Sequence, residues 1–132
     1  MTREVKFRGK RIDNGGWIGG CLVSVLDAEA CNRYPNIVIS YNNDTFDWID
    51  VLPGTIGQFT GLKDRDGKEI YEGDILKTYP IIASDKIGDG AFNVLVEWDG
   101  SSWIANGILG NNQAIISKVV GNIYDNPELL NQ

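Results

Sequence analysis

The feature that most constrains how this 132-residue chain can fold is the close spacing of its turn residues. Sixteen glycines, singly and in pairs, separate short runs that are rich in Val, Ile, Phe, Tyr and Trp. Such runs, bounded by turn residues, are typical of β-strands. No segment keeps a helical period over roughly a dozen residues. The sequence therefore predicts a mostly β, short-stranded, barrel-like fold with minimal helix.

The expected strands can be placed along the chain from the alternation of apolar and polar residues. They cover residues 4–8, 17–26, 36–41, 55–60, 69–71, 75–78, 92–98 and 103–104, with one or two more within 114–123. In the strand at 92–98, alternation places Phe92, Val94, Val96 and Trp98 on one face. Turns are expected at 13–16, 63–68 and 99–100, where Asn-Gly and Asp-Gly tolerate the angles of hairpins. One helical turn is expected at 27–33, and a short helix beginning at Asn126-Pro127.

A polar stretch that ends in Pro53-Gly54 divides the chain near its middle. We expect an N-terminal β lobe over residues 1–54 and a barrel-like C-terminal lobe of about five strands over residues 55–132. The two lobes could also share a core and form one compact domain, because the chain is short enough for either arrangement.

Charge argues against a polyanionic partner. The net charge is −6, and binding to nucleic acid depends on a basic face that releases counterions. The exception is a local group of four cations near the start, which are Lys6, Arg8, Lys10 and Arg11. Solvation at a strand edge explains them more simply than nucleic-acid binding, which stays an alternative.

The compartment is expected to be the cytoplasm. The first residues are charged throughout and lack the apolar region of a secretory signal. No apolar run approaches the roughly 20 residues of a membrane span. The two cysteines, Cys21 and Cys31, are expected to be reduced thiols, since a disulfide framework usually needs more of them.

Several chemistries are excluded by composition. The chain has no histidine, which removes Ser-His-Asp and Cys-His catalysis and every His-containing zinc site. Two cysteines cannot supply a tetrahedral thiolate site, and no phosphate-binding glycine loop is present. The Asp64–Gly67 segment resembles a calcium loop only superficially, because the first and twelfth positions lack carboxylates. We therefore expect no catalytic residue, metal ligand or cofactor, and a hairpin turn at Asp64–Gly67.

Three nearby carboxylates leave one enzymatic alternative open. Glu69, Glu72 and Asp74 could run acid–base chemistry or hold Mg²⁺ if they shared a face. The favoured interpretation is structural, since Gly-Asp before an apolar strand commonly sets a tight turn in which the Asp accepts backbone N–H groups.

Two of the four tryptophans flank a predicted hairpin tip. Trp98 and Trp103 could present a stacking platform to a partner, although such pairs more often lock the hairpin by packing across the strands. Trp17 and Trp48 are expected in the core. We name Trp98 and Trp103 as the candidate partner-binding residues.

Three segments carry a resemblance to a known family. They are residues 3–11 with Trp17, residues 57–64 continuing through 67–75, and residues 120–130. Together they resemble the YopX family, small proteins encoded in bacterial phages and prophages. The resemblance implies a β-rich fold and a phage or prophage origin, and it implies no activity.

The leading functional expectation is a non-enzymatic binding or assembly module that forms a homo-oligomer, with a phage or host protein as a further possible partner. The strand at 92–98 carries only Glu97 as a charge and has no proline, which makes it a poor solitary edge. Ile81-Ile82-Ala83 and Ile108-Leu109 could bury their side chains against a second copy. They could equally fill the core of one chain.

Overall fold

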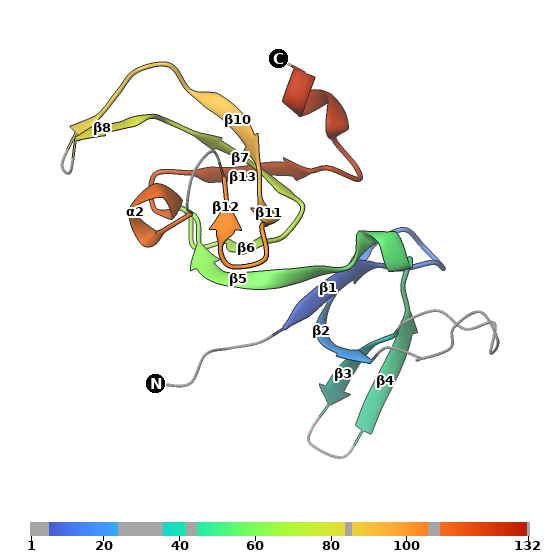
Figure 1. Cartoon of the computed structure of the whole chain (residues 1–132). Coiled ribbons are helices and arrows are strands. Elements are labelled where there is room, and N and C mark those ends of the chain that lie inside the picture. The colour runs from blue at the N-terminus through green and yellow to red at the C-terminus, as the bar shows by residue number, and fades with distance from the viewer. Residues whose placement is uncertain (1–5, 24–35, 42–44, 84–85, 106–108, 132) are drawn as a thin grey trace. The chain divides into compact units, whose positions relative to one another are not determined.

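The structure is a computed structural model, and it describes residues 6–23, 36–41, 45–83, 86–105 and 109–131. The mostly β, antiparallel prediction is confirmed: short strands dominate, and the described helices are single turns (Figure 1). The described strands form small open sheets, and none of these closes into a barrel. The chain comprises two compact units, Met1–Phe59 and Thr60–Gln132, which we call unit 1 and unit 2.

Unit 1 is an antiparallel sheet with strand order β4-β3-β2-β1, and the start of β5 pairs with β1. Its elements are β1 (Phe7–Lys10), β2 (Trp17–Val23), β3 (Asn36–Tyr41), β4 (Thr45–Asp50), the 3-10 turn η1 (Pro53–Thr55) and the first residues of β5 (Gly57–Lys63). The sheet is closely packed at Gly9, where an added Cβ would lie 2.8 Å from the Cβ of fully buried Val51.

Several strand predictions in unit 1 can be compared with the structure. The prediction at 36–41 coincides with β3, whereas residues 4–5, 24–26 and the helical turn at 27–33 lie outside the described residues. No strand was expected over residues 45–50, and residues 47–50 were assigned to the polar boundary, which is wrong. Residues 45–50 form β4, because each of them pairs with a residue of β3 in unbroken register.

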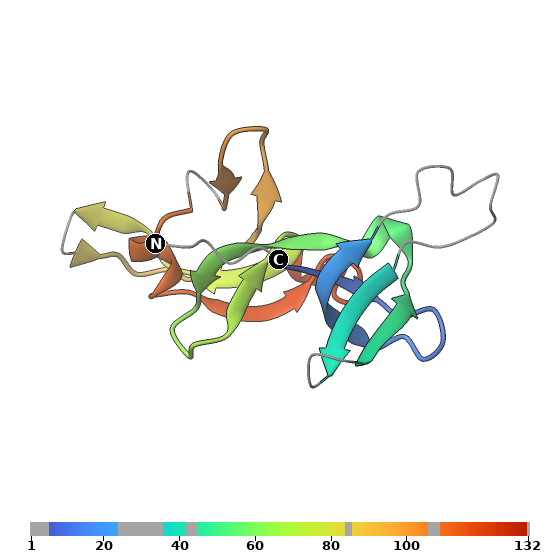
Figure 2. The same cartoon turned by 90° about the horizontal axis from the view of Figure 1, so that it is seen from below.

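Unit 2 is built around a three-stranded antiparallel sheet in which β7 is the central strand, between β10 and β13. Two separate two-stranded sheets, β8–β9 and β11–β12, extend from it (Figure 2). The elements are β6 (Glu69–Tyr71), β7 (Asp74–Thr78), β8 (Ile81–Ala83), β9 (Lys86–Ile87), β10 (Phe92–Leu95), β11 (Glu97–Trp98), β12 (Trp103–Ile104), α2 (Asn111–Ala114), β13 (Lys118–Asn122) and the 3-10 turn η2 (Pro127–Asn131).

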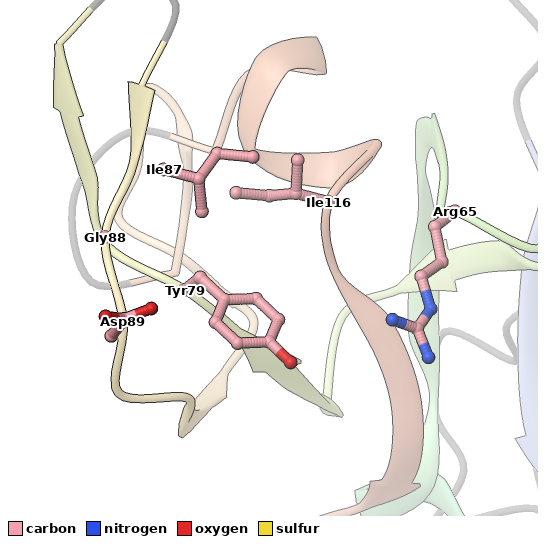
Figure 3. A pocket seen from close by; sticks show the side chains of 6 residues that line it. All are labelled: Arg65, Tyr79, Ile87, Gly88, Asp89 and Ile116. Carbon is pink, nitrogen blue, oxygen red and sulfur yellow. The ribbon is translucent and has the colours of Figure 1, made fainter.

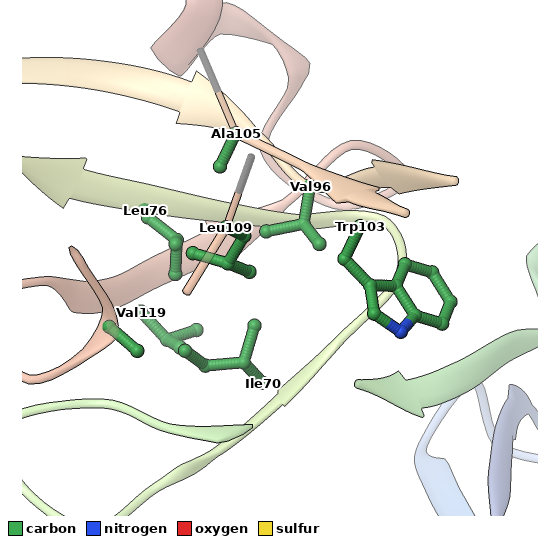
Figure 4. Packing of buried hydrophobic residues seen from close by; sticks show 8 residues of the cluster. Ile70, Leu76, Val96, Trp103, Ala105, Leu109 and Val119 are labelled. Atoms are coloured by element: carbon green, nitrogen blue, oxygen red, sulfur yellow. The ribbon is translucent and has the colours of Figure 1, made fainter. Parts of the chain in front are cut away.

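The hydrophobic core of unit 2 draws on β6, β7, β12, α2 and β13 and on residues between elements (Figure 4). Its buried members are Ile70, Leu76, Val96, Trp103, Ala105, Leu109, Ala114 and Val119. Leu76 comes from the central strand and Val119 from its neighbour β13, so the core covers one face of the three-stranded sheet. Leu109 is therefore a core residue and does not face a second copy, while Ile108 lies outside the described residues.

The predicted strand at 92–98 is interrupted at Val96. Its N–H donates to the Asp74 carbonyl at 2.9 Å, and its carbonyl accepts from Gly73 N–H at 2.9 Å. Beyond this point the chain leaves β7 and pairs with β12 instead. The alternation of the sequence predicted Val96 and Trp98 on the same face of one strand. This prediction is wrong, because the Val96 side chain is 1% exposed and the Trp98 side chain is 47% exposed.

The C-terminal predictions are confirmed in outline. The Asp-Gly turn at 99–100 joins β11 to β12, with Trp98 opposite Trp103. The short helix starting at Pro127 is η2. Within 114–123 the structure has one strand, β13, which follows the helical turn α2 and contains a bulge between Val119 and Gly121.

Candidate functional site

A pocket of about 390 Å³ lies in unit 2 where four segments meet. It is lined by Arg65 from the β5–β6 turn, Tyr79 after β7, Ile87, Gly88 and Asp89 at and after β9, and Ile116 before β13 (Figure 3). Tyr79, Ile87 and Ile116 supply an apolar wall, and Arg65 and Asp89 supply opposite charges. This pocket was not predicted from the sequence, because its residues come from four separate parts of the chain.

A buried polar cluster fixes the chain close to this pocket. Ser117 Oγ lies 2.8 Å from Thr78 Oγ1 and donates to the Gln113 carbonyl at 2.6 Å. The Gln113 side-chain amide donates to Thr78 Oγ1 and to the Tyr79 carbonyl. Thr78 and Ser117 are fully buried. These bonds tie α2 to the end of β7 and so hold Tyr79 and Ile116 on adjacent segments.

The two candidate partner-binding tryptophans differ sharply in exposure. Trp103 is 8% exposed and belongs to the core, whereas Trp98 is 47% exposed. Their ring centroids lie 4.9 Å apart at an interplanar angle of 58°, so Trp98 rests against a fixed neighbour. The pair therefore packs across the hairpin and also leaves one indole accessible.

The hairpin that carries Trp98 is held by Asp99. Its Oδ1 accepts the N–H groups of Ser101 at 2.8 Å and Ser102 at 2.7 Å. These N–H groups hold the pKa of the Asp99 carboxyl below its ordinary value. The ionised side chain thereby fixes the turn between β11 and β12.

The β8–β9 ribbon exposes apolar side chains. Ile81 is 42% exposed, Ile82 is 59% exposed, and Ile87 is 51% exposed. Ile81 pairs with Ile87 across the ribbon, and the register shifts between Ile81 and Ala83, where Ile82 lies. This small ribbon thus presents three isoleucines to solvent.

The structure places the three carboxylates on which the enzymatic alternative rests. Asp74 is 1% exposed, and its Oδ2 accepts the Tyr71 N–H at 2.8 Å, as the structural interpretation predicted. Glu69 Oε1 accepts the Tyr71 hydroxyl at 3.4 Å. Glu69, Glu72 and Asp74 do not come together as a cluster that could hold a metal ion, and no other group of three or more Cys, Asp or Glu in the described residues does so.

The basic group near the start of the chain is largely engaged within unit 1. Lys6 lies over the Phe59 ring at 5.1 Å, and Arg8 lies over the Trp17 ring at 4.8 Å. Arg11 forms a bidentate pair with Asp13, at 2.9 Å and 2.7 Å, which holds the pKa of Asp13 below its ordinary value. Weak or absent nucleic-acid binding stays a prediction.

The remaining predicted residues are placed as follows. Trp17 is half-buried, and the Trp48 side chain lies outside what the structure describes. Cys21 is an exposed free thiol, and Cys31 lies outside the described residues. No described helix has the length and apolar character needed to cross a membrane.

The predicted turn at Asp64–Gly67 is confirmed, and Asp64 is its organising residue. Asp64 Oδ1 accepts the N–H groups of Asp66 and Lys68, both at 2.9 Å. Its Oδ2 accepts the Val119 N–H at 3.0 Å, on a strand 55 residues away. The carboxylate therefore closes the β5–β6 turn and attaches it to β13.

The segment from Gly121 to Asn131 is likewise shaped by close backbone contacts. Asn122 Oδ1 accepts the N–H groups of Tyr124 at 3.0 Å and Asp125 at 2.9 Å. Gly121 cannot be replaced without displacement, because an added Cβ would lie 2.5 Å from Asn126 Oδ1. At Gly73, with φ of +92°, an added Cβ would lie 3.1 Å from the Tyr124 ring. These side chains and glycines hold the backbone at the point where β13 ends.

Comparison with known proteins identifies the family. The model of the YopX protein family matches residues 6–131. The chain belongs to the YopX family. Its fold is similar to that in the crystal structure of protein EF1440 from Enterococcus faecalis, with a TM-score of 0.58 and 21% identity over 98% of this chain and 99% of that one. No curated protein matches the sequence.

The segments by which the sequence resembles the YopX family include these structural residues. Asp64, Gly73 and Asp74 lie in the central segment, and Gly121 and Asn126 lie in the C-terminal one. Each is accounted for by a turn, a close approach or a backbone hydrogen bond. The accessible groups of this YopX-family chain, including the β8–β9 isoleucines, Trp98 and the pocket, lie mostly outside those segments.

Proposed function

We propose that this YopX-family chain is a non-enzymatic binding module that assembles with a second copy of itself through the β8–β9 ribbon. The observation that carries the proposal is the exposure of three isoleucines on one short two-stranded sheet. A two-stranded ribbon is marginally stable alone in water and gains stability from packing against another surface. A second ribbon related by a two-fold axis supplies such a surface with matching apolar side chains.

The edge of the three-stranded sheet supports the same proposal. In the described part of the chain, β10 pairs with β7 and with no strand on its other side. The Asn93 side-chain amide donates to the Leu129 carbonyl at 3.0 Å, which ties η2 to this strand. An edge covered this way is protected from pairing, so the exposed ribbon is the better candidate for the contact.

The proposal is tested by sedimentation velocity on the full chain and two matched variants. Ile82→Ser removes an apolar group exposed on the ribbon, and Ile12→Ser removes one of 41% exposure on unit 1. We expect Ile82→Ser to raise the dimer dissociation constant at least about tenfold, since both copies lose the apolar contact. Ile12→Ser should leave it unchanged. A wild-type chain that sediments as a monomer at every concentration would refute the proposal.

Trp98 favours a second candidate function, the binding of a different protein. A half-exposed indole held against a buried one has the features of an interface anchor, because little side-chain entropy remains to be lost. This candidate predicts that a phage or host partner, once identified, loses affinity for Trp98→Ala but not for Ile82→Ser. Equal affinity of both variants for that partner would contradict it.

A further inference from the structure

The pocket in unit 2 has the composition of a small-ligand site. Its volume of about 390 Å³ lies within the range of pockets that bind small molecules, roughly 300–1,000 Å³. Such sites combine an apolar lining with a few polar groups that fix orientation. Here the lining is the Tyr79 ring with Ile87 and Ile116, and the charged groups are Arg65 and Asp89.

Arg65 is held at the pocket by its backbone. Its N–H donates to the Ser117 carbonyl at 2.9 Å, and the preceding Asp64 is bonded to Val119. Within the described residues, Arg65 forms an ion pair in which its Nε lies 3.9 Å from Asp66 Oδ2. The Arg65 side chain is 48% exposed. Because this contact is long and solvated, the guanidinium retains donors for a carboxylate.

Asp89 supplies the opposite charge. Within the described residues its carboxylate has no hydrogen bond or ion pair, and the residue is exposed. The backbone just before it is fixed, because Gly88 N–H donates to the Pro80 carbonyl at 2.8 Å. Figure 3 shows Asp89 and Arg65 on opposite sides of the Tyr79 ring. The pocket therefore presents a cation, an apolar surface and an anion in sequence.

We propose that this pocket binds a small zwitterionic molecule whose apolar body separates its two charges. The ligand's carboxylate faces Arg65, its ammonium group faces Asp89, and its body lies on Tyr79, Ile87 and Ile116. A ligand that carries only a carboxylate offers no partner to Asp89. A ligand that carries only an ammonium group offers no partner to Arg65. The proposal goes beyond self-association, and the two surfaces share Ile87, whereas Ile81 and Ile82 belong to the ribbon and do not line the pocket.

The test is a titration of the full chain followed by two-dimensional amide NMR. The probes are linear ω-amino acids of increasing chain length, compared with hexanoate and hexylamine. We expect saturable shifts at Tyr79, Ile87 and Ile116, with the best ω-amino acid binding about five- to tenfold more tightly than either singly charged probe. Equal affinity for the three probe classes, or no saturable shift at these residues with any probe, would overturn the proposal.

Two variants assign each charge to its residue. Arg65→Gln should lower the affinity for hexanoate and for the ω-amino acid, and it should leave the affinity for hexylamine unchanged. Asp89→Asn should lower the affinity for hexylamine and for the ω-amino acid, and it should leave the affinity for hexanoate unchanged. Asp66→Asn is the matched control, because Asp66 is exposed beside Arg65 and does not line the pocket. Both test residues are exposed, so amide dispersion should be preserved. An ω-amino acid affinity that is unaffected by both pocket variants would contradict the assignment.

Discussion

Asp64 joins two parts of unit 2 that are far apart in sequence. Its carboxylate accepts three backbone N–H groups, two from its own turn and one from Val119 on β13. Burial opposes ionisation of this side chain, which is 6% exposed. The N–H groups of Val119, Lys68 and Asp66, with the nearby Lys68 charge, outweigh burial and hold the pKa of Asp64 below its ordinary value. The ionised form is therefore the one that the fold stabilises.

Asp64→Asn should lower the free energy of unfolding by about 1–3 kcal/mol near pH 6, because the amide turns a donor toward one of these N–H groups. The folded pKa lies below the unfolded one, so this stabilisation is present above the ordinary value of 3.8 and is lost as pH falls through the folded pKa. The difference between wild type and variant should accordingly shrink in acid. Urea denaturation at several pH values measures it.

The control for this prediction is Asp66→Asn, two residues away in the same turn. Asp66 is exposed and lies 3.9 Å from Arg65, so its replacement should change stability by no more than about 0.5 kcal/mol at any pH. A loss for Asp64→Asn that is independent of pH, or equal to that of Asp66→Asn, would contradict the role assigned to the Asp64 carboxylate.

Residue roles could be predicted from the sequence when the partners are local. The Asp74 carboxylate bonds to Tyr71 three residues away, and the Gly-Asp pattern was sufficient to predict such a bond. For Asp64 the turn was predictable, but the bond to Val119 spans 55 residues and leaves no trace in local spacing. The pocket was missed for the same reason, because Arg65 and Asp89 are far apart in sequence and line the same pocket only in the folded chain.

At the scale of elements, the β11–β12 hairpin combines a core residue with an exposed one. Trp103→Ala should cost about 3–5 kcal/mol of unfolding free energy, because it removes a buried aromatic side chain from the core. Trp98→Ala should cost less than about 1.5 kcal/mol, the value of an aromatic pair contact, because its ring is already half in water. Chemical denaturation of both variants provides the comparison, and equal losses would show that this division is wrong.

Strand placement did not follow sequence separation alone. Strand β7 pairs with the distant β10 and β13 and was placed correctly, whereas β4 and the β8–β9 hairpin have local partners and were missed. The turn at 99–100 and strand β3 were found from alternation and turn residues alone. The break at Val96 arises because its backbone pairs with Gly73 and Asp74, which lie more than 20 residues earlier. Ribbon β8–β9 was not among the expected strands, although Ile81 pairs with Ile87 across it.

At the scale of the whole molecule, the large exposed apolar side chains are concentrated in unit 2. Those of the described residues are Ile81, Ile82, Ile87, Trp98, Ile115 and Tyr124 in unit 2, against Ile12 and Leu52 in unit 1. Monomeric proteins rarely expose large contiguous apolar patches, and β8–β9 contributes three isoleucines in one short ribbon. The family segments contain turn and close-contact residues of the fold, and this ribbon is the surface through which we propose that the chain assembles.

Hydrogen exchange at β8–β9 tests this assembly most directly. Amide exchange is followed by mass spectrometry at two protein concentrations that lie well below and well above the dissociation constant found by sedimentation. The account predicts that the amides of Ile81, Ile82 and Ile87 exchange more slowly at the higher concentration, while those of β3 in unit 1 do not change. Exchange at the ribbon that is independent of concentration, with a mass that stays at the 14.6 kDa of one chain, would contradict it.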